Sequence, residues 1–249
     1  MLDPRPPQIS LSPLDEERFG IRTARAPDVR AETVPAILTF CRENRVVLAI
    51  GRCSVARPDA AQEMERSGFL LMDTLVYYLR NIREAPAAAG VQGILVRPFR
   101  PGEEEAVVRV ATVAFRDYPS HYQADGRLDT RKSNEIYPSW ALRTCTSHEP
   151  ADRVLVAESE GVVAGFASIH RSCAEEASVE LFAVDPAWHG RGVARSLLGQ
   201  TVEWCGSEGV SRVLYSTQIT NRPAQKLLVR LGFEPSRASY TFHKWFDGA

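Results

Sequence analysis

One strand–turn–helix segment constrains this chain more than any other. The apolar run Val179–Val184 ends at Asp185-Pro186, and Gly190 and Gly192 then precede a stretch with apolar residues at helical spacing. Glycine tolerates the left-handed backbone of a tight turn and puts no Cβ between the backbone and a ligand. The first amides of a helix lack acceptors within the helix and favour a phosphate. The segment therefore predicts a diphosphate-binding turn at the start of a helix over 192–207.

Two nucleotide-binding motifs do not fit this segment. The dinucleotide fingerprint needs a third glycine where Arg195 stands, and an acid about 20 residues on, where the chain has Arg212. The Walker loop needs Gly-Lys-Ser/Thr, which is absent. Two glycines before a helix also occur in ordinary strand-to-helix turns, so the glycines alone leave the ligand open.

The rest of the chain alternates between strand and helix patterns. Strands are predicted at 46–50, 69–79, 94–97, 154–158, 162–169, 178–184, 210–217 and 238–245, and helices at 33–41, 59–67, 102–115, 130–144, 192–207 and 222–231. Ser159-Glu160-Gly161 predicts a hairpin turn. This order predicts an α/β (α+β) fold in which helices flank a mixed, twisted sheet.

Residues 84–93 are small and nearly featureless, which indicates a linker. We therefore predict a domain boundary near residue 92, with a smaller N-terminal domain over 1–92 and a larger domain over 93–249. A helix followed by Gly-Phe and a strand occurs in both parts, at Gly68-Phe69 and at Gly232-Phe233. The repeat fits a decayed duplication, and equally the general use of glycine to end helices.

Composition excludes several classes of protein. Thirty basic and 31 acidic side chains give a net charge of −1, whereas a general binder of nucleic acid or of anionic membranes needs a basic surplus. No apolar run approaches the roughly 20 residues of a membrane span, and the N-terminus lacks the order of a signal peptide. Scattered cysteines and histidines without metal-ligand spacing predict neither a disulfide framework nor a metal site. We expect a cytoplasmic protein that binds a small molecule, with a homodimer through Tyr77-Tyr78 and the last strand as one assembly.

The glycine segment resembles the acetyl-CoA loop of the GNAT superfamily of N-acetyltransferases, whose signature is Gln/Arg-x-x-Gly-x-Gly/Ala. His189 takes the place of the first Gln or Arg, and the family's later Asn-x-x-Ala is matched by Asn221 and Ala224 before a helix that ends in Gly-Phe. The resemblance covers about residues 93–246 and implies acetyl-CoA as the acyl donor. The residues it implies for binding are Phe182, Ala183, Val184, His189, Gly190, Arg191, Gly192, Val193, Ala194, Asn221 and Ala224.

The whole chain resembles the two-domain acetyltransferases that act on nucleotide-linked 4-amino-4,6-dideoxy sugars, the TDP-fucosamine acetyltransferase group. The likeness rests on Phe19-Gly20, on Gly-Phe-x-Leu-x-Asp-Thr from Gly68, on Ala114–Arg116 and on Ile136–Trp140. It implies that the first domain is a partial, degenerate GNAT copy without a CoA loop. It also implies transfer of acetyl to the amine of an amino sugar. Another small amine as acceptor (an antibiotic, an amino acid derivative or a natural-product intermediate) and an inactive CoA-binding regulator are the alternatives.

In the family the amine attacks the thioester directly, so a base must take the ammonium proton. If the strand is regular, Glu176, Ser178, Glu180 and Phe182 share one face. Glu180 is then the first candidate base, Glu176 the second, and His170 at the end of the preceding strand the third. Glu180 is equally an ordinary solvated or ion-paired strand residue on this pattern.

An acid should also protonate the leaving thiolate, and here the chain departs from the family. The tyrosine that is common about four residues before Gly-Phe is replaced by Leu228. Tyr215, Tyr240 or water could take its place. A Leu228→Tyr variant would test what the missing hydroxyl changes.

The acceptor is expected over residues 116–147, where polar and aromatic side chains could bond sugar hydroxyls, stack on a base or pair with a diphosphate. Most side chains of such a segment are ordinary surface residues. The candidates are His121, Tyr122, Arg131 and Tyr137, within a wider set that also holds Asp117, Tyr118, Asp125 and Lys132.

Overall fold

The computed structural model describes residues 8–82, 90–147, 149 and 152–246. Most of the expected linker, at 83–89, lies outside the described residues. The strands are β1 Ser10–Leu11, β2 Thr23–Ala26, β3 Leu48–Ser54, β4 Leu70–Asn81, β5 Leu95–Pro98, β6 Asp152–Ser159, β7 Val162–Arg171, β8 Glu176–Val184, β9 Arg212–Gln218 and β10 Glu234–Trp245. The helices are α1 Pro13–Phe19, α2 Val34–Glu43, α3 Pro58–Arg66, α4 Glu104–Ala114, α5 His121–Ala124, α6 Thr130–Asn134, α7 Ile136–Thr146, α8 Val193–Ser207 and α9 Arg222–Arg230, with 3-10 turns η1 Ala31–Thr33 and η3 Pro186–Trp188.

The strands form one sheet in the order β1-β2-β3-β10-β4-β9-β8-β7-β6-β5. The pairs β2–β3 and β8–β9 are parallel and the others are antiparallel. Around β6, β7 and β8, helices α8 and α9 pack on one face of the sheet and α4 and α7 on the other. The predicted mixed sheet flanked by helices is therefore confirmed.

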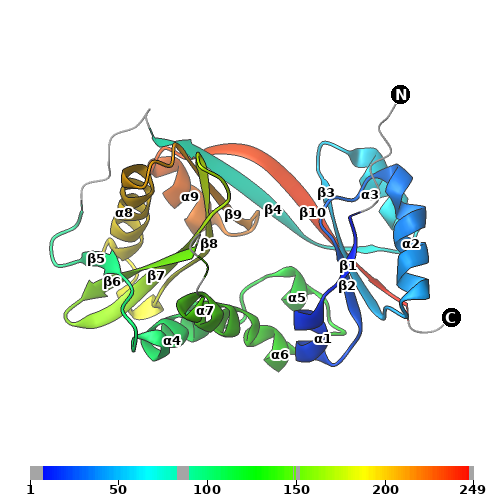
Figure 1. The fold of residues 1–249 in the computed structure, drawn as a ribbon, viewed down its shortest axis with the longest axis horizontal. Helices are drawn as coiled ribbons and strands as arrows, with labels where there is room; N and C mark the ends of the chain where they lie inside the picture. Colours follow the sequence, from blue (N-terminus) through cyan, green and yellow to red (C-terminus); the bar gives the residue numbers. More distant parts are fainter. Residues whose placement is uncertain (1–7, 83–89, 148, 150–151, 247–249) are drawn as a thin grey trace.

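The two halves of the chain exchange their last strands. β10, the end of the C-terminal half, lies between β3 and β4, while β4 from the N-terminal half pairs with β9. In Figure 1 these two long strands join the lobe with α8 and α9 to the lobe with α2 and α3. Each exchanged strand follows a helix and a Gly-Phe pair, as the repeated pattern in the sequence suggests. The boundary near residue 92 stays a prediction, and the sheet runs through both sides of it.

Local signals fixed most element ends. The expected hairpin joins β6 to β7 through Glu160 (φ 52°) and Gly161 (φ 75°), the left-handed pair of a type I′ turn. The strand expected at 46–50 was placed too early, because β3 runs through Gly51 to Ser54. A Cβ at Gly51 would lie 2.6 Å from Met64 Cε, so this glycine lets α3 pack closely. The single helix expected over 130–144 is two helices, α6 and α7, that meet at Glu135.

Candidate functional site

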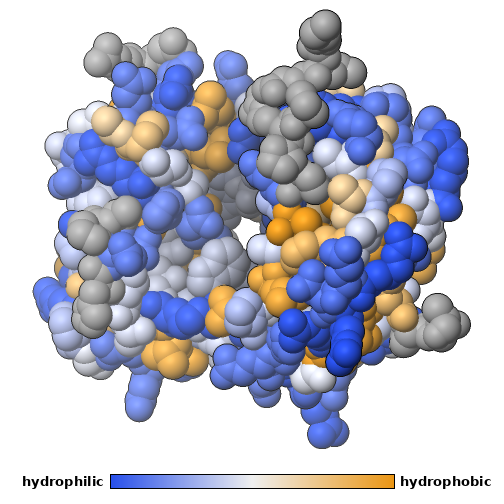
Figure 2. All heavy atoms as spheres, turned by 45° about the vertical axis from the view of Figure 1, so that its right-hand side comes forward, coloured by the Kyte–Doolittle hydropathy of each residue, from blue (hydrophilic) through white to orange (hydrophobic). Residues whose placement is uncertain are grey.

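β8 and β9 separate at the centre of the sheet. Their parallel pairing covers Glu176–Val179 and Arg212–Tyr215 and ends there, although β8 continues to Val184 and β9 to Gln218. Both diverging ends line a cleft of about 1550 Å³ that reaches into the N-terminal half. The surface is visibly hollowed between the two halves (Figure 2). The divergence leaves backbone amides and carbonyls of β8 without partners in β9, ready for an extended ligand.

A β-bulge at Glu180 sits where the strands part. Ser168 faces Leu181 and Ile169 faces Val179, so Glu180 is an extra residue in β8. Val179 belongs to the apolar cluster under α8, whereas Leu181 belongs to the cluster under α4 and α7. A bulge bends a strand and breaks its alternation.

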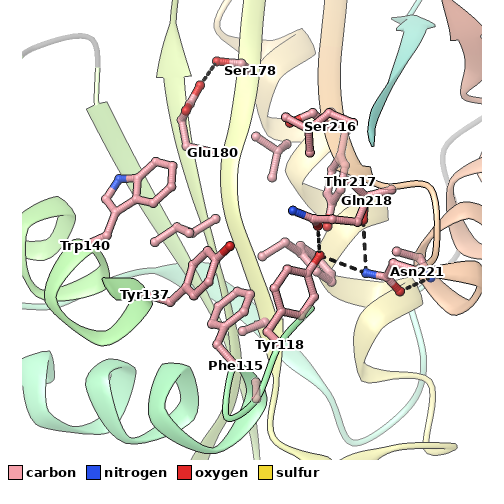
Figure 3. A pocket seen from close by; sticks show the side chains of 18 of the residues that line it. Phe115, Tyr118, Tyr137, Trp140, Ser178, Glu180, Ser216, Thr217, Gln218 and Asn221 are labelled. Carbon is pink, nitrogen blue, oxygen red and sulfur yellow. Dashed lines mark hydrogen bonds between the residues drawn. The ribbon is translucent and has the colours of Figure 1, made fainter. Parts of the chain in front are cut away.

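The bulge corrects one expectation. Phe182 packs on the α8 side of the sheet, opposite to Ser178 and Glu176, so these residues do not share one face. Glu180 contacts Ser178, whose hydroxyl donates to the Glu180 carboxylate (Figure 3). The reason is the extra residue, which reverses the parity of every side chain after it.

The predicted turn leads from β8 into α8. The carboxylate of Asp185 accepts the Ala187 amide at 2.9 Å and pairs with Arg109 of α4 at 2.5 Å, which anchors the turn to the core. Gly190 (φ 76°) and Gly192 (φ 85°) both take the left-handed conformation. α8 begins at Val193, so its first amides face the cleft with no acceptor in the helix.

Ten of the eleven residues expected to bind the donor line the cleft, and Arg191 does not. The Arg191 guanidinium lies 4.8 Å from the Trp188 ring centroid and 3.9 Å from Glu160. His189 lines the cleft, but its Nε2 lies 3.2 Å from the Val184 carbonyl. A carbonyl only accepts, so the Nε2 proton of His189 is engaged by Val184 and is not free for a phosphate. The backbone amides of the turn, rather than these two side chains, remain as donors.

An aromatic cluster that includes two residues of the expected acceptor segment, Tyr118 and Tyr137, lines the middle of the cleft. The Tyr118 ring lies edge-on to Phe115 (5.4 Å) and Tyr137 (5.5 Å). Its hydroxyl donates to the Gln218 side chain and lies 3.3 Å from Asn221 Nδ2 (Figure 3). Tyr118 therefore brings a hydroxyl to the diverging end of β9 from the loop between α4 and α5. The sequence placed Tyr118 in the wider set of acceptor residues, and its position beside Gln218 and Asn221 was not predicted.

Asn221 holds the start of α9. Its side-chain oxygen accepts the Ala224 amide at 3.3 Å, and its Nδ2 donates to Thr217 Oγ1 at 3.0 Å. Asn and Asp are favoured at this position because they satisfy an orphan amide of the first turn. The expected pair Asn221 and Ala224 thus lies at the cleft wall, next to Tyr118.

The candidate bases and acids divide into two groups. Glu180, Glu176 and Tyr215 line the cleft, and Glu176 lies 3.5 Å from the Arg212 guanidinium. His170 does not line it, and its Nδ1 lies 2.8 Å from Asp152.

The two tyrosines have different surroundings. Burial raises the pKa of Tyr215, which lies 6.0 Å from Phe182 between ring centroids. Tyr240 is outside the cleft, packed against the apolar cluster of the N-terminal half. Leu228, where the family has tyrosine, lines the cleft as a buried apolar residue.

Three of the four acceptor candidates line the cleft: His121, Tyr122 and Tyr137. Arg131 is exposed on α6 and lies outside it. The hydroxyl of Tyr122 donates to Asp15 at 3.0 Å and accepts from Arg25, and burial raises its pKa to about 12. Tyr122 is thus tied into the wall.

The part of the cleft away from β8 is cationic. Arg18, Arg52, Arg143 and Arg237 line it, and within the described residues none of them is paired with a carboxylate. Burial and the nearby Arg18 both lower the pKa of Arg143. Unneutralised arginines at one surface attract an anion.

Comparison with known proteins identifies the domain. Residues 112–233 match the model of the Acetyltransferase (GNAT) family. Residues 112–233 thus resemble a GNAT acetyltransferase domain. Solved structures share its fold over nearly the whole chain. A GCN5-related N-acetyltransferase from Kribbella flavida aligns with TM-score 0.69 at 14% identity, over 98% of this chain and 89% of its own.

A second solved structure has two GNAT units. It is a tandem GNAT protein from the clavulanic acid biosynthesis pathway, which aligns with TM-score 0.63 at 16% identity, over 98% of this chain and 86% of its own. At such identities the likeness concerns the fold.

Two curated relatives have a higher sequence identity to this chain than the two solved structures have. Spore coat polysaccharide biosynthesis protein SpsD of Bacillus subtilis (strain 168) is 29% identical over 59% of this chain and 50% of its own length. A mycothiol acetyltransferase of Nocardioides sp. is 28% identical over 71% of this chain and 62% of its own length. The chain thus spans half to about three fifths of these relatives.

The described part of the chain lacks two kinds of feature. No group of three or more His, Cys, Asp or Glu residues there could hold a metal ion. None of the helices described is both long and apolar enough to cross a membrane.

Proposed function

We propose that the protein is an acetyl-CoA-dependent N-acetyltransferase that transfers acetyl to the amine of an amino sugar, and that the sugar is linked to a nucleotide. The observation that carries the proposal is the divergence of β8 and β9 beside the glycine turn of α8. An extended thioester arm fits the unpaired strand edges, and a diphosphate fits the first amides of α8. Cationic and aromatic walls meet this place from the other side.

When bound, acetyl-CoA would supply the activated acyl group. The amides of residues 190–195 would hold its diphosphate, and the free β8 edge after the bulge would orient its arm. A backbone amide near Phe182 or Ala183 would polarise the carbonyl, as an oxyanion hole does.

Proton transfer falls to side chains at the same place. Glu180, at the bulge, is positioned to receive a proton from the acceptor side of the sheet. Because position 228 is a leucine and has no proton to donate, we assign the protonation of the leaving thiolate to the Tyr118 hydroxyl, which lies beside Asn221 and Gln218. Proton transfers of this kind contribute about 10²–10⁴-fold in rate.

The nucleotide-linked acceptor is supported by the walls of the far cleft. Arg18 and Arg143 would bind a diphosphate, and the flat Trp140 ring beside them offers a stacking surface for a base. The name of SpsD connects that relative to polysaccharide biosynthesis. We place the reaction in the cytoplasm, where the five unpaired cysteines stay reduced.

A second acceptor class has one observation in its favour. Several relatives at 28–31% identity are mycothiol acetyltransferases, which points to a different small amine. A CoA-binding protein without activity remains the third alternative, because Leu228 replaces the usual acid.

One experiment separates the three. Acetyl-CoA affinity is measured by calorimetry, and thiol release is followed with a TDP-linked 4-amino-6-deoxy sugar, the free amino sugar and unrelated small amines. The proposal expects binding together with a preference for the nucleotide-linked sugar. Preference for another amine supports the second class, and binding without acylation of any amine supports the third. No heat with CoA would rule out the donor site.

A further inference from the structure

Three side chains form a buried chain of hydrogen bonds that ends at the cleft. Asp125 Oδ2 lies 2.7 Å from His243 Nδ1, and His243 Nε2 lies 2.8 Å from His121 Nδ1. The three residues come from the loop after α5, from β10 and from the start of α5. All are buried, and His243 is 0% exposed. These hydrogen bonds join His243 to two residues more than 100 positions earlier in the sequence.

The partners of Asp125 determine which atom donates in the hydrogen bond between Asp125 and His243. Its carboxylate also accepts the Trp245 indole N–H (2.9 Å) and the Arg127 amide (3.0 Å), so it is an ionised acceptor. Burial tends to raise the pKa of Asp125, but its hydrogen bonds with His243 and Trp245 outweigh this and hold the pKa below its usual range.

The tautomers of both histidines follow from this. His243 Nδ1 must carry a proton, because it faces a carboxylate that only accepts. When the His243 ring carries only this proton, its Nε2 holds a lone pair and accepts from His121 Nδ1. His121 is left with a lone pair at Nε2.

That lone pair opens to the cleft. His121 lines the cleft, and its Nε2 has no hydrogen-bond partner among the described residues. His121 Nε2 is not among the side-chain atoms of the described part that are both without a hydrogen-bond partner and sealed from solvent. His121 Nε2 is therefore unpaired but accessible. A buried hydrogen-bond network that leaves one acceptor free at the wall of a cleft has the form of a base and the groups that orient it.

The charged groups around His121 keep the ring neutral. Asp73 of β4 accepts its backbone amide at 3.1 Å. Arg52 of β3 and Arg25 of β2 approach from the N-terminal half, and the Tyr122 ring lies 3.8 Å away between centroids. Burial, His243 and the two arginines all lower the pKa of His121, well below its usual value. A neutral imidazole at neutral pH is the form that accepts a proton.

We propose that His121 Nε2 receives the proton of the acceptor's ammonium group, and that His243 and Asp125 position it. This role rests on the proposed function, and it competes with Glu180 as the base. The ammonium N–H bond breaks, its electron pair stays on the amine nitrogen for attack on the thioester, and the proton binds Nε2. The positive charge moves to the imidazolium, which the Asp125 carboxylate stabilises through His243. The His121 imidazolium then releases the proton to water in the cleft.

The test compares His121→Gln with Glu180→Gln, and adds Asp125→Asn. kcat/KM is measured from pH 5 to 9, with thermal unfolding and acetyl-CoA affinity as controls for folding. We expect a wild-type acidic limb below pH 6.5, since His121 must be neutral and its pKa is lowered. His121→Gln should remove this limb and lose about 100-fold or more in kcat/KM. Asp125→Asn should move the limb to lower pH and reduce the plateau, because the imidazolium loses its counter-charge.

A second measurement needs no turnover and no variant. Imidazole ¹⁵N shifts of the wild-type protein report which ring nitrogen carries each proton. We expect His121 and His243 both protonated at Nδ1 near pH 7. A proton on His121 Nε2 would overturn the proposal even if no variant folds.

The outcomes separate this proposal from the proposed function. If His121→Gln keeps its rate within about 3-fold and its acidic limb, the base role is wrong, and loss in Glu180→Gln then assigns the base to Glu180. If the wild-type protein binds acetyl-CoA but acylates no amine, the proposed function is wrong and the base role falls with it. Loss of activity in His121→Gln with intact folding and donor binding supports both.

Discussion

At the scale of single residues, the site depends on side chains whose surroundings give them their chemistry. Tyr118 is one aromatic residue among several in its segment, and its hydroxyl donates to the Gln218 side chain and meets Asn221 at the diverging strands. Leu228 also lines the cleft, as a buried apolar residue. Under the proposed function, Tyr118 supplies from a different loop the hydroxyl that position 228 lacks.

Tyr118→Phe tests whether the Tyr118 hydroxyl takes the role of the one missing at position 228. It removes only the hydroxyl, so the ring contacts with Phe115 and Tyr137 persist. We expect kcat to fall by about 100-fold with acetyl-CoA affinity within a few-fold of wild type. Rates measured by thiol release check this, and an unchanged kcat would leave thiolate protonation to water or to Tyr215.

Leu228→Tyr is the matched variant. Position 228 is 1% exposed, so the larger ring overpacks the core, and we expect the free energy of unfolding to fall by about 1–3 kcal/mol. Combined with Tyr118→Phe, it should recover part of the lost kcat if a hydroxyl near Asn221 is all that the reaction needs. Chemical denaturation and thiol release measure the two effects, and no recovery in a folded double variant would count against Tyr118 as the acid.

At the scale of elements, the glycine turn and α1 show how neighbouring segments support the cleft. A Cβ at Gly192 would lie 2.9 Å from Val91 Cγ2, and the Val91 amide donates to Ser196 Oγ at 3.1 Å. The segment before β5 therefore packs on the start of α8. From the sequence, a side chain at 192 would crowd a phosphate; in the structure it meets Val91 first.

Gly192→Val therefore tests packing as well as ligand binding. The residue is held at φ 85°, and a branched side chain there is strained, so we expect a loss of about 1–3 kcal/mol in unfolding free energy as well as weaker acetyl-CoA binding. Val91→Ala in the same chain should recover stability without recovering affinity if the turn amides bind the donor. Denaturation and calorimetry measure the two separately, and joint recovery of both would contradict a direct role of the turn.

The docking of α1 depends on a buried ion pair. Asp15 is 1% exposed and accepts Arg25 Nε at 2.6 Å, and it also bonds Ser12 and Tyr122. Burial tends to raise the pKa of Asp15, but the hydrogen bonds and charge of Arg25 outweigh it and lower the pKa below 3.8.

Asp15→Asn should therefore destabilise the protein at neutral pH, on the order of 3 kcal/mol. The folded state favours the ionised carboxylate, so its contribution is complete above the unfolded pKa and is lost as pH falls through the folded pKa. The stability difference between wild type and variant should shrink below about pH 4. Urea denaturation at pH 7 and at pH 3 measures this, and a difference independent of pH would contradict it.

At the scale of the whole molecule, the exchange of β4 and β10 makes each half depend on the other. β9 has β4 as its neighbour, and β10 lies between two strands of the N-terminal half. A cut at the predicted boundary therefore removes the strand that covers β9 and the two strands that hold β10. Two of the cleft arginines without a carboxylate partner depend on this exchange, because Arg237 lies on β10 and Arg52 on β3, which pairs with β10.

We expect residues 93–249 alone to lack cooperative unfolding, because β9 and β10 would expose their edges and the apolar cluster would lose Tyr78. Residues 1–92 expressed with 93–249 should restore a cooperative transition and acetyl-CoA binding. Circular dichroism and calorimetry on the fragments and on their mixture check this. If the fragment 93–249 unfolds cooperatively and binds CoA, this half of the chain does not depend on the N-terminal half, and the prediction is wrong.

The sequence by itself determined the parts of this protein that depend on neighbouring residues. The glycine turn into α8, the hairpin at Glu160-Gly161 and the cap of α9 by Asn221 each follow from backbone conformation or from an amide a few positions away. The tertiary structure alone decided the strand exchange, the bulge that turned Phe182 away from Glu176, the arrival of Tyr118 at Asn221 and the chain from Asp125 to His121. These join residues that are distant along the chain, and burial and packing across the sheet, rather than local periodicity, choose such partners.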